Sequence, residues 1–340
     1  MDRDSTMLAL VVEKHGSIDA LTLKTLPEPI AARGEVLLDV RAASVNFPDL
    51  MVIAGTYQNL PALPFVPGKD MAGVVAAVGE GVTRVKVGDR VMATIEHGAF
   101  AQRCVVSERF CQQMPQSMRF AQGAAIGLVY VTAYFALVER AGLRPGEKVL
   151  VTGAAGGVGL AAVQVAKALG ATVVAAVSST GKATMALQNG ADHVVRTDVA
   201  NLRDALRAQV FAAVGPGGVD IVIDQVGGDV FDASLRTLAW CGRLVIVGFA
   251  EGRVPEVKAG LLLVKNISLI GLQVSDYRER AVAKVNEAQA HLCAMFGEGS
   301  LKPQIMAEVP LHEFPRAFAA VRDRQVLGKV VLDMGAPGAS

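Results

Sequence analysis

The sequence has few cysteines and no excess of either charge. Its four cysteines, Cys104, Cys111, Cys241 and Cys293, form no C-x-x-C pair, so neither a disulfide framework nor a zinc ribbon is indicated. With 33 basic and 32 acidic residues, the chain lacks the positive charge that nucleic acid or an anionic membrane would require. We therefore expect a cytoplasmic globular protein whose partner is a small molecule, not nucleic acid or a membrane.

The sequence also lacks a recognisable signal peptide. Residues 1–16 are charged ahead of a short apolar run and contain no small-residue cleavage site. The longest uncharged stretch, residues 120–138, approaches the roughly 20 residues that a membrane-spanning helix needs. Because it contains Gln122, Thr132 and two glycines, we interpret it as a buried loop and helix of a soluble protein.

The first third of the chain has the pattern of an irregular β-rich domain. A length of 340 residues exceeds one ordinary core and predicts two domains. Short apolar runs alternate there with Gly, Pro and Asp turn signals. The expected strands are "MLALVVEK", "GEVLLDVRAASV", "DMAGVVAAVG", "GDRVMATI" and "FAQRCVV".

Further along, strand-like and helix-like segments alternate. The series runs through "KVLVT", "GGVGLAAVQVAKALG", "ATVVAAV", "STGKATMALQNG", "DHVV", "LRDALRAQVFAAV", "VDIVID", "VFDASLRTLAW", "RLVIVGF" and "NISLIGL". Its six strands predict a complete parallel dinucleotide-binding sheet covered on both faces. We therefore predict an α/β protein with a catalytic domain at 1–125, completed by about 273–340, and a doubly wound domain at 126–272. Two late helices and the strand "GKVVLDM" are expected to return to the first domain.

A glycine-rich turn joins the first strand and helix of this series. In "VLVTGAAGGVGLAAVQ", Ala154-x-Gly156-x-x-Gly159 supplies the small residues that let a backbone approach pyrophosphate and let a helix pack closely on a strand. The helix N-terminus then offers free N–H donors to the phosphates. The predicted contacts are Ala155, Gly156, Gly157, Val158 and Gly159. The alternative is a tight connection with no ligand.

The second strand of the series does not end in a carboxylate. No Asp or Glu lies between Glu147 and Asp192, although an acid at this strand end would bind the ribose hydroxyls of NAD. A carboxylate about 4 Å from a 2′-phosphate would repel it by about 1–4 kcal/mol per unit charge. The strand instead leads into Ser178, Ser179 and Lys182, with Arg196 after the next strand, and this favours NADPH. "SSTGK" also has the residues of a helix N-cap, and both interpretations are compatible.

Taken together, these motifs resemble the medium-chain dehydrogenase/reductase superfamily, and within it the zinc-free NADPH:quinone oxidoreductases, the ζ-crystallin-like group. The resemblance runs from "AASVNFPDLMVIAGTYQ" and "LPFVPGKDMAGVVAAVGEGVTRVKVGDRV" through "TAYFALVERAGLRPGEKVLVTGAAGGVGLAAVQ" to "VDIVIDQVGGDVFDASL", "GRLVIVGF" and "GKVVL". It implies a GroES-like catalytic domain, a Rossmann domain, and a homodimer joined edge to edge through "NISLIGL".

The residues at the zinc positions differ from those of related alcohol dehydrogenases. Those enzymes carry a cysteine where this chain has Asn46, and G-H-E where it has Gly68, Lys69 and Asp70. Neither Asn46 nor Lys69 is a plausible zinc ligand here, and we expect no metal. Alcohol oxidation without a Lewis acid loses its main source of catalysis, whereas hydride transfer to a quinone or an α,β-unsaturated carbonyl remains feasible.

The resemblance also assigns site residues. It brings Asn46, Asp49 and Tyr57 near the nicotinamide and the acceptor, Asn46 as a donor to the acceptor oxygen and Tyr57 as a stacking or donating ring. A capped turn is the alternative for Asn46 and Asp49. Thr197, beside Arg196, stands where many relatives have a tyrosine at the adenosine end. The remaining expected cofactor contacts are Thr132, Val226, Gly248, Phe249, Gly271, Leu272 and Gln273.

Three functions follow as hypotheses. The first is a zinc-independent NADPH:quinone oxidoreductase. The second is a reductase of enones or enoyl thioesters, which needs the same hydride geometry. The third is a non-catalytic NADPH-binding protein with a sensing or structural role.

Overall fold

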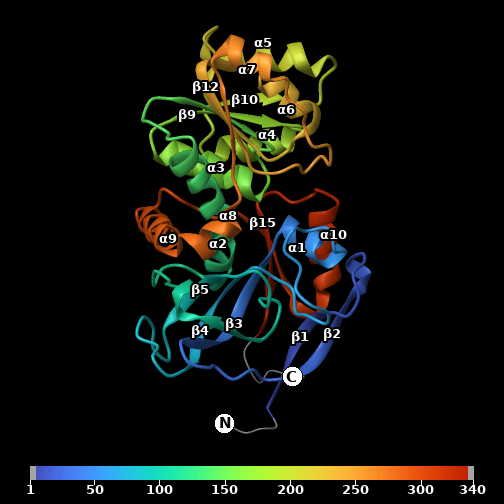
Figure 1. Ribbon diagram of the computed structural model, residues 1–340, viewed down its shortest axis with the longest axis vertical. Helices are drawn as coiled ribbons and strands as arrows, with labels where there is room; N and C mark the ends of the chain where they lie inside the picture. Colours follow the sequence, from blue (N-terminus) through green and yellow to red (C-terminus); the bar gives the residue numbers. More distant parts are fainter. Residues whose placement is uncertain (1–4, 336–340) are drawn as a thin grey trace. The chain divides into compact units, whose positions relative to one another are not determined.

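The computed structural model describes residues 5–335. The chain forms two compact units. The first unit contains the chain up to Leu128, Ala281–Cys293 and the chain from Pro303 on. The second unit contains Val129–Arg280 and Ala294–Lys302. Figure 1 labels the helices and many of the strands of both.

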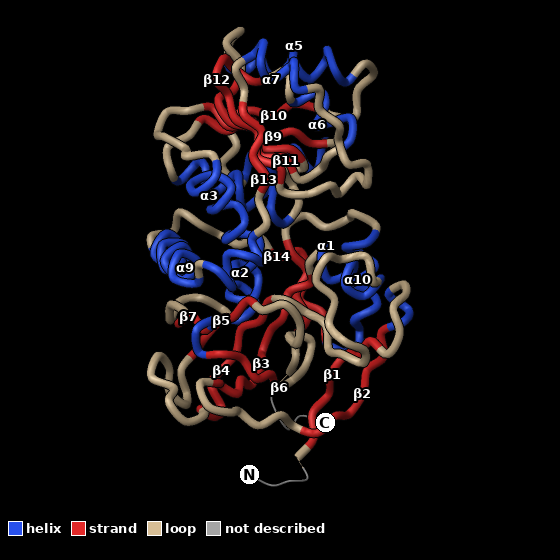
Figure 2. The backbone as a smooth tube through the Cα atoms, in the orientation of Figure 1, coloured by secondary structure: helices blue, strands red, loops and turns tan. Residues whose placement is uncertain are grey.

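The first unit is built on a seven-stranded sheet in the order β14-β15-β3-β4-β5-β7, with β6 paired to β3, and on the separate hairpin β1-β2, which Figure 2 shows as two adjacent strands. Its strands are β1 (Thr6–Val12), β2 (Leu21–Pro27), β3 (Glu35–Val45), β4 (Asp70–Val78), β5 (Arg90–Thr94), β6 (Arg103–Ser107), β7 (Cys111–Gln113), β14 (Ile305–Pro310) and β15 (Lys329–Asp333). Its helices are α1 (Phe47–Ala54) and α10 (Phe314–Arg322), with α2 (Phe120–Tyr134) and α9 (Val282–Gly297) each containing a boundary between the units.

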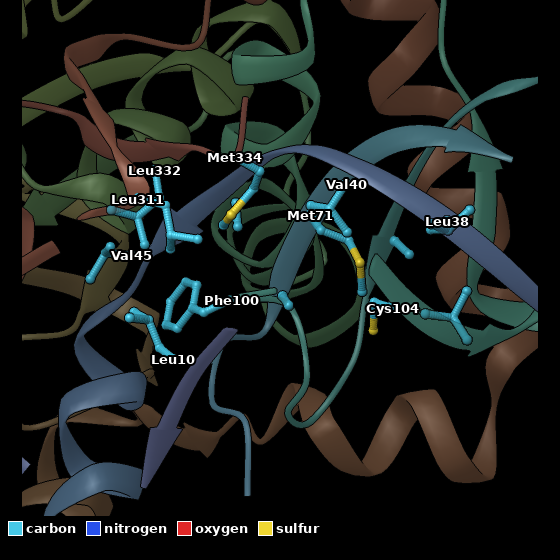
Figure 3. Packing of buried hydrophobic residues seen from close by; sticks show 14 of the residues in the cluster. Leu10, Leu38, Val40, Val45, Met71, Phe100, Cys104, Leu311, Leu332 and Met334 are labelled. Carbon is cyan, nitrogen blue, oxygen red and sulfur yellow. The ribbon is translucent and has the colours of Figure 1, made fainter. Parts of the chain in front are cut away.

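The core of the first unit joins segments far apart in the sequence. Phe100 is fully buried and lies among Leu10 from β1, Val45 from β3 and Leu332 from β15 in Figure 3. The strand β15 pairs antiparallel with β3 and parallel with β14. The strand expected over "GKVVLDM" thus lies in the first unit, and burial of its apolar run completes this core.

The second unit contains a six-stranded parallel sheet in the order β10-β9-β8-β11-β12-β13. Six strands in this order, with a switch point between β8 and β11, confirm the predicted doubly wound sheet. The strands are β8 (Lys148–Thr152), β9 (Thr172–Val177), β10 (His193–Arg196), β11 (Val219–Asp224), β12 (Leu238–Ile246) and β13 (Ser268–Gly271).

Helices cover both faces of this sheet, because its strands are apolar on both sides. In Figure 1, α5 (Leu202–Val214) and α6 (Gly228–Ser234) lie on one side and α3 (Gly157–Ala168) on the other. Leu206, Val210 and Phe231 pack from α5 and α6 against buried strand residues. The unit also contains α4 (Thr180–Gln188), α7 (Ala259–Lys265) and α8 (Val274–Arg280).

Two expected elements have different bounds. The helix expected over "VFDASLRTLAW" ends at Ser234, and Leu238–Trp240 already belong to β12, so the apolar "LAW" run is strand and not helix. The single helix expected over "RERAVAKVNEAQAHLCAMF", residues 278–296, is divided between α8 and α9, which lie on either side of Ala281. Among the described residues, the helix at Phe120–Arg140 is long and apolar enough to cross a membrane, but 78% of its most apolar window is buried within the protein, as in a core helix.

Candidate functional site

The glycine-rich turn lies between β8 and α3, as predicted. A Cβ on Gly159 would lie 2.2 Å from the Gly153 carbonyl oxygen, so this glycine lets the helix pack directly on the turn. Gly156 differs: its backbone is extended (φ −82°, ψ 177°), and a Cβ there would meet only the Gly153 oxygen, at 3.5 Å. Neither strain nor crowding within the chain explains glycine at 156. Bare backbone at this point fits a pyrophosphate that approaches closely.

The neighbouring strand β11 braces this turn. Thr152 donates its hydroxyl to Asp224 Oδ1 at 2.6 Å, and Asp224 Oδ2 accepts the Gly227 N–H at 3.0 Å. Gln225 donates its amide to the Thr152 carbonyl. Burial raises the pKa of Asp224 above its usual range, opposed by its hydrogen bond from Thr152. The carboxyl ends of β8 and β11 are thereby held together, at the edge where doubly wound sheets bind ligands.

The loops after β11 and β12 meet at this same edge. The Glu251 N–H donates to the Val226 carbonyl at 2.8 Å, and a Cβ on Gly227 would lie 3.3 Å from the Phe249 Cα atom. The structure therefore brings the predicted contacts Val226, Gly248 and Phe249 together.

The other predicted nicotinamide contacts already have partners inside the second unit. The Gly271 carbonyl accepts from Arg140 at 3.1 Å, and the Leu272 N–H donates to Ile246 at 3.0 Å. The Gln273 side chain accepts the Asp276 N–H at 3.0 Å. Thr132 is buried in α2.

The segment 178–182 gathers the hydroxyl and cationic groups predicted for a 2′-phosphate. Ser179 caps α4 by accepting the Lys182 N–H at 3.4 Å, and the Lys182 ammonium donates to the Ser178 hydroxyl at 3.2 Å. Arg196 Nη1 donates to the Thr180 hydroxyl at 3.2 Å. The segment is therefore both a helix cap and a donor cluster. Thr197 is anchored by its N–H to the Val177 carbonyl at 2.9 Å.

In the first unit, Asn46 is the centre of a buried polar network. Its amide nitrogen donates to Asp70 Oδ2 at 3.1 Å and to the Ser44 carbonyl at 3.2 Å. Its amide oxygen accepts from the Lys329 ammonium, which also donates to the Val45 carbonyl at 3.1 Å. Both amide hydrogens and the amide oxygen thus have partners. A direct contact from Asn46 to an acceptor requires exchange of one of these bonds.

Asp70 links this network to α2. Its Oδ1 atom accepts from the Thr94 hydroxyl at 2.8 Å and from the Leu128 N–H at 2.9 Å. Gly127 permits this approach, because a Cβ there would lie 2.5 Å from the same oxygen. A fourth bond comes from the Ser44 hydroxyl, which donates to Asp70 Oδ2 at 3.3 Å. Asp70 is fully buried, and these four hydrogen bonds supply the partners that a buried carboxylate requires.

Asp49 lies in the first turn of α1 and is 1% exposed. Its Oδ2 atom accepts the Asn46 N–H at 2.8 Å, which is the capping contact named as the alternative to catalysis. Burial raises the pKa of Asp49 from 3.8 to about 7, while Lys69 opposes the increase. Burial also disfavours the charged form of Lys329 and therefore lowers its pKa, while the neighbouring Asp70 and Asp49 carboxylates oppose this decrease.

Tyr57 belongs to a second polar group, around Lys69. The Lys69 ammonium lies 4.6 Å from the centre of the Tyr57 ring and donates to the Glu96 carboxylate at 2.8 Å and to the Glu96 carbonyl at 3.1 Å. Lys69 is 1% exposed, so this cation–π contact is desolvated and holds the ring.

These side chains do not fit a zinc ion. Lys69 and Asn46, at two positions that hold zinc ligands in the related alcohol dehydrogenases, are committed to the hydrogen bonds above. Within residues 5–335, no group of three or more His, Cys, Asp or Glu side chains is placed to hold a metal.

Sequence reasoning assigned no site role to Lys329, Asp70, Thr94 or Ser44. One signal was available: Lys329 and Asp70 are charged residues in otherwise apolar strands, "KVVLD" and "DMAGVVAAV". Charges in buried strands need partners. Which partners they find depends on pairings across 283 residues of chain, which no local pattern contains.

Comparisons with known proteins agree with this architecture. Residues 32–128 match the family described as the alcohol dehydrogenase GroES-like domain, and residues 157–288 match the zinc-binding dehydrogenase family. Quinone oxidoreductase-like protein 2 of Mus musculus is 38% identical over 91% of this chain and 87% of its own length.

Solved structures are also similar. The quinone oxidoreductase of Escherichia coli, complexed with NADPH, has a TM-score of 0.86 and 29% identity, covering 96% of this chain and 99% of its own. The enoyl reductase CurK has a TM-score of 0.87 and 26% identity, covering 98% and 99%. The expected GroES-like and Rossmann combination is confirmed.

Proposed function

The chain belongs to the medium-chain dehydrogenase/reductase superfamily, and from this premise we propose that it is a zinc-independent reductase that transfers hydride from NADPH to a quinone. The observation that carries the proposal is the pair Asn46 and Lys69, bonded to protein groups where the zinc enzymes have ligands. A site of this kind has no Lewis acid for alcohol oxidation, but it can serve an acceptor that takes hydride readily.

The second unit supplies the cofactor site. NADPH, when bound, provides the hydride. The turn at Gly156 and the start of α3 bind the pyrophosphate through backbone N–H groups. Ser178, Lys182 and Arg196 bind the 2′-phosphate by hydroxyl and charge-assisted hydrogen bonds.

The first unit supplies the acceptor side. Reduction of a quinone consumes one hydride and one proton and gives the hydroquinone, so the protein must hold a developing oxyanion until water protonates it. We assign Tyr57 as the donor to that oxygen, because Lys69 fixes its ring. Asn46 contributes a second donor by exchanging its bond to the Ser44 carbonyl. Asp49 supports α1 through its bond to the Asn46 N–H.

The test is NADPH oxidation with a panel of small ortho- and para-quinones. The proposal expects turnover with at least one quinone and a large loss of kcat in Tyr57→Phe, which removes the hydroxyl and keeps the ring over Lys69. Turnover at background with every quinone rejects the proposal. Tight NADPH binding without turnover on any acceptor supports the non-catalytic sensor or structural role instead.

A second candidate is reduction of enones or enoyl thioesters. The similarity to the enoyl reductase CurK favours it, and the same donors stabilise an enolate as they do a quinone oxyanion. A crotonyl thioester and a quinone, compared at equal concentration with NADPH, separate the two. A higher kcat/KM for the thioester selects the second candidate.

We also propose a homodimer joined through β13. This strand is the edge of its sheet, and an unpaired edge is a template for another strand. Leu263 and Val264 from the preceding helix α7 are 79% and 80% exposed, and Trp240 in the adjacent β12 is 77% exposed. A second copy would cover these apolar side chains.

A further inference from the structure

The strand β9 does not end in a carboxylate, but an acidic residue, Asp198, follows its neighbour β10. Asp198 follows β10, and β10 pairs parallel with β9, so that Arg196 is the register partner of Val177. Arg196 holds the Asp198 carboxylate with two bonds, Nε to Oδ1 at 2.8 Å and Nη2 to Oδ2 at 2.5 Å. The carboxylate is therefore paired with the arginine that ends the strand next to β9.

Both the backbone and the guanidinium of Arg196 are held by hydrogen bonds. Gln209 from α5 accepts the Arg196 N–H at 2.8 Å and donates to its carbonyl at 3.0 Å. At the other end, the guanidinium uses two nitrogens on Asp198 and the third on the Thr180 hydroxyl, at 3.2 Å. A planar guanidinium bound at two edges has one orientation. Its Nη1 side consequently faces segment 178–182.

The charges at this site oppose each other. The hydrogen bond from Arg196 lowers the pKa of Asp198, so the carboxylate is ionised at neutral pH. The Lys182 ammonium donates to the Ser178 hydroxyl, and the Arg196 guanidinium donates to the Thr180 hydroxyl. Each of the two cations therefore contacts a hydroxyl of the segment. The Arg196 guanidinium therefore stands between the Thr180 hydroxyl and the Asp198 carboxylate.

We propose that Arg196 and Asp198 form a charge-masking pair that sets the choice between NADPH and NADH. Arg196 donates to the 2′-phosphate and screens it from Asp198. Without Arg196, Asp198 becomes the repelling carboxylate that this fold otherwise places at the end of β9 in NADH-dependent proteins. This inference rests on the proposed NADPH-binding site and identifies Asp198 as a specificity-determining residue.

Loss of Arg196 should weaken NADPH binding more than loss of Lys182. Lys182→Ala removes one favourable charge, and we expect about a tenfold weaker NADPH Kd, the effect of a unit charge near a protein surface. Arg196→Ala removes a charge and also uncovers an opposing one, so we expect about a hundredfold loss. Asp198→Asn in the Arg196→Ala background should recover about tenfold. The NADH Kd should change less than threefold throughout, because NADH has no 2′-phosphate.

The experiment is an equilibrium titration of NADPH and NADH by cofactor fluorescence, with wild type, Lys182→Ala, Arg196→Ala and Arg196→Ala/Asp198→Asn. NADH binding in each variant shows that the fold is intact. Recovery of NADPH affinity in the double variant supports the masking pair, and recovery that shrinks at high salt supports its electrostatic origin.

Two outcomes overturn the proposal. If the double variant binds NADPH as weakly as Arg196→Ala, Asp198 has no influence on the phosphate and the masking pair is wrong. In that case, a loss of NADPH affinity in Lys182→Ala would still support the proposed phosphate site. If none of the variants changes NADPH affinity, the phosphate site is elsewhere and the cofactor part of the proposed function fails with it.

Discussion

Replacing Asp49 by asparagine should change how stability depends on pH. Asp49 is 1% exposed and accepts the Asn46 N–H at 2.8 Å, and an asparagine oxygen can accept the same bond. Burial raises the pKa of Asp49 from 3.8 to about 7, with Asp70 adding to the increase and Lys69 and Lys329 opposing it. The folded state therefore retains the Asp49 proton over a pH range in which the unfolded chain has lost it.

The sign and size follow from this difference in pKa. For a group whose pKa is raised on folding, the contribution to stability is fully present below pH 3.8 and is lost as the pH rises to about 7. A gap of roughly three pH units, at about 1.4 kcal/mol each, corresponds to a loss of up to about 4 kcal/mol. Asp49→Asn cannot ionise and escapes that loss. Its stability relative to wild type should increase steadily between pH 4 and pH 7.

Urea denaturation followed by far-ultraviolet circular dichroism at pH 4.5, 5.5, 6.5 and 7.5 measures this difference. The effects of titrating groups that do not interact with Asp49 cancel between the two proteins. Asp49→Ala is the matched control. It should show the same pH slope, displaced downward by about 1 kcal/mol at every pH because the capping bond is absent. A difference between Asp49→Asn and wild type that stays constant from pH 4.5 to 7.5 would refute the argument from burial.

Three further predictions follow from the packing. Gly127→Ala should lower the free energy of unfolding by about 1–3 kcal/mol, because its Cβ would lie 2.5 Å from Asp70 Oδ1. Gly260→Ala, where a Cβ would have nothing within 4 Å, should not lower it. Equal losses of stability in the two variants would contradict this prediction. Lys329→Met should cost about 2–3 kcal/mol in the same assay, since Asn46 Oδ1 loses its donor; no loss would mean that the bond contributes nothing. Leu263→Asp should shift sedimentation from dimer to monomer, and an unchanged dimer would exclude that face.

The cofactor unit was largely predictable because its signals are local. "KVLVT", "LRDALRAQVFAAV" and "VDIVID" coincide with β8, α5 and β11, since apolar strands and an amphipathic helix are each specified by their own residues. The glycine turn and the segment 178–182 are likewise contiguous in sequence. Their residues could therefore be named from the sequence, whereas the bonds that hold them, from Asp224, Gln225 and Arg196, could not.

The polar network of the first unit was less predictable. Asn46 and Asp49 were found through a family resemblance, but Lys329 reaches Asn46 only because β15 pairs with β3. β14 was missed because "IMAEVP" alternates weakly and becomes a strand only beside β15. The Arg196–Asp198 pair depends on a side-chain conformation, which charge patterns along the chain do not specify.

The bond between Lys329 and Asn46 has a consequence for synthesis. Residue 46 leaves the ribosome long before residue 329, and the whole dinucleotide-binding sheet is translated between them. A nascent or prematurely terminated chain can therefore possess every residue of the cofactor site while its Asn46 amide still lacks the ammonium that orients it. The Asn46 network is therefore complete only after β15 has been translated, and β15 follows every strand of the dinucleotide-binding sheet.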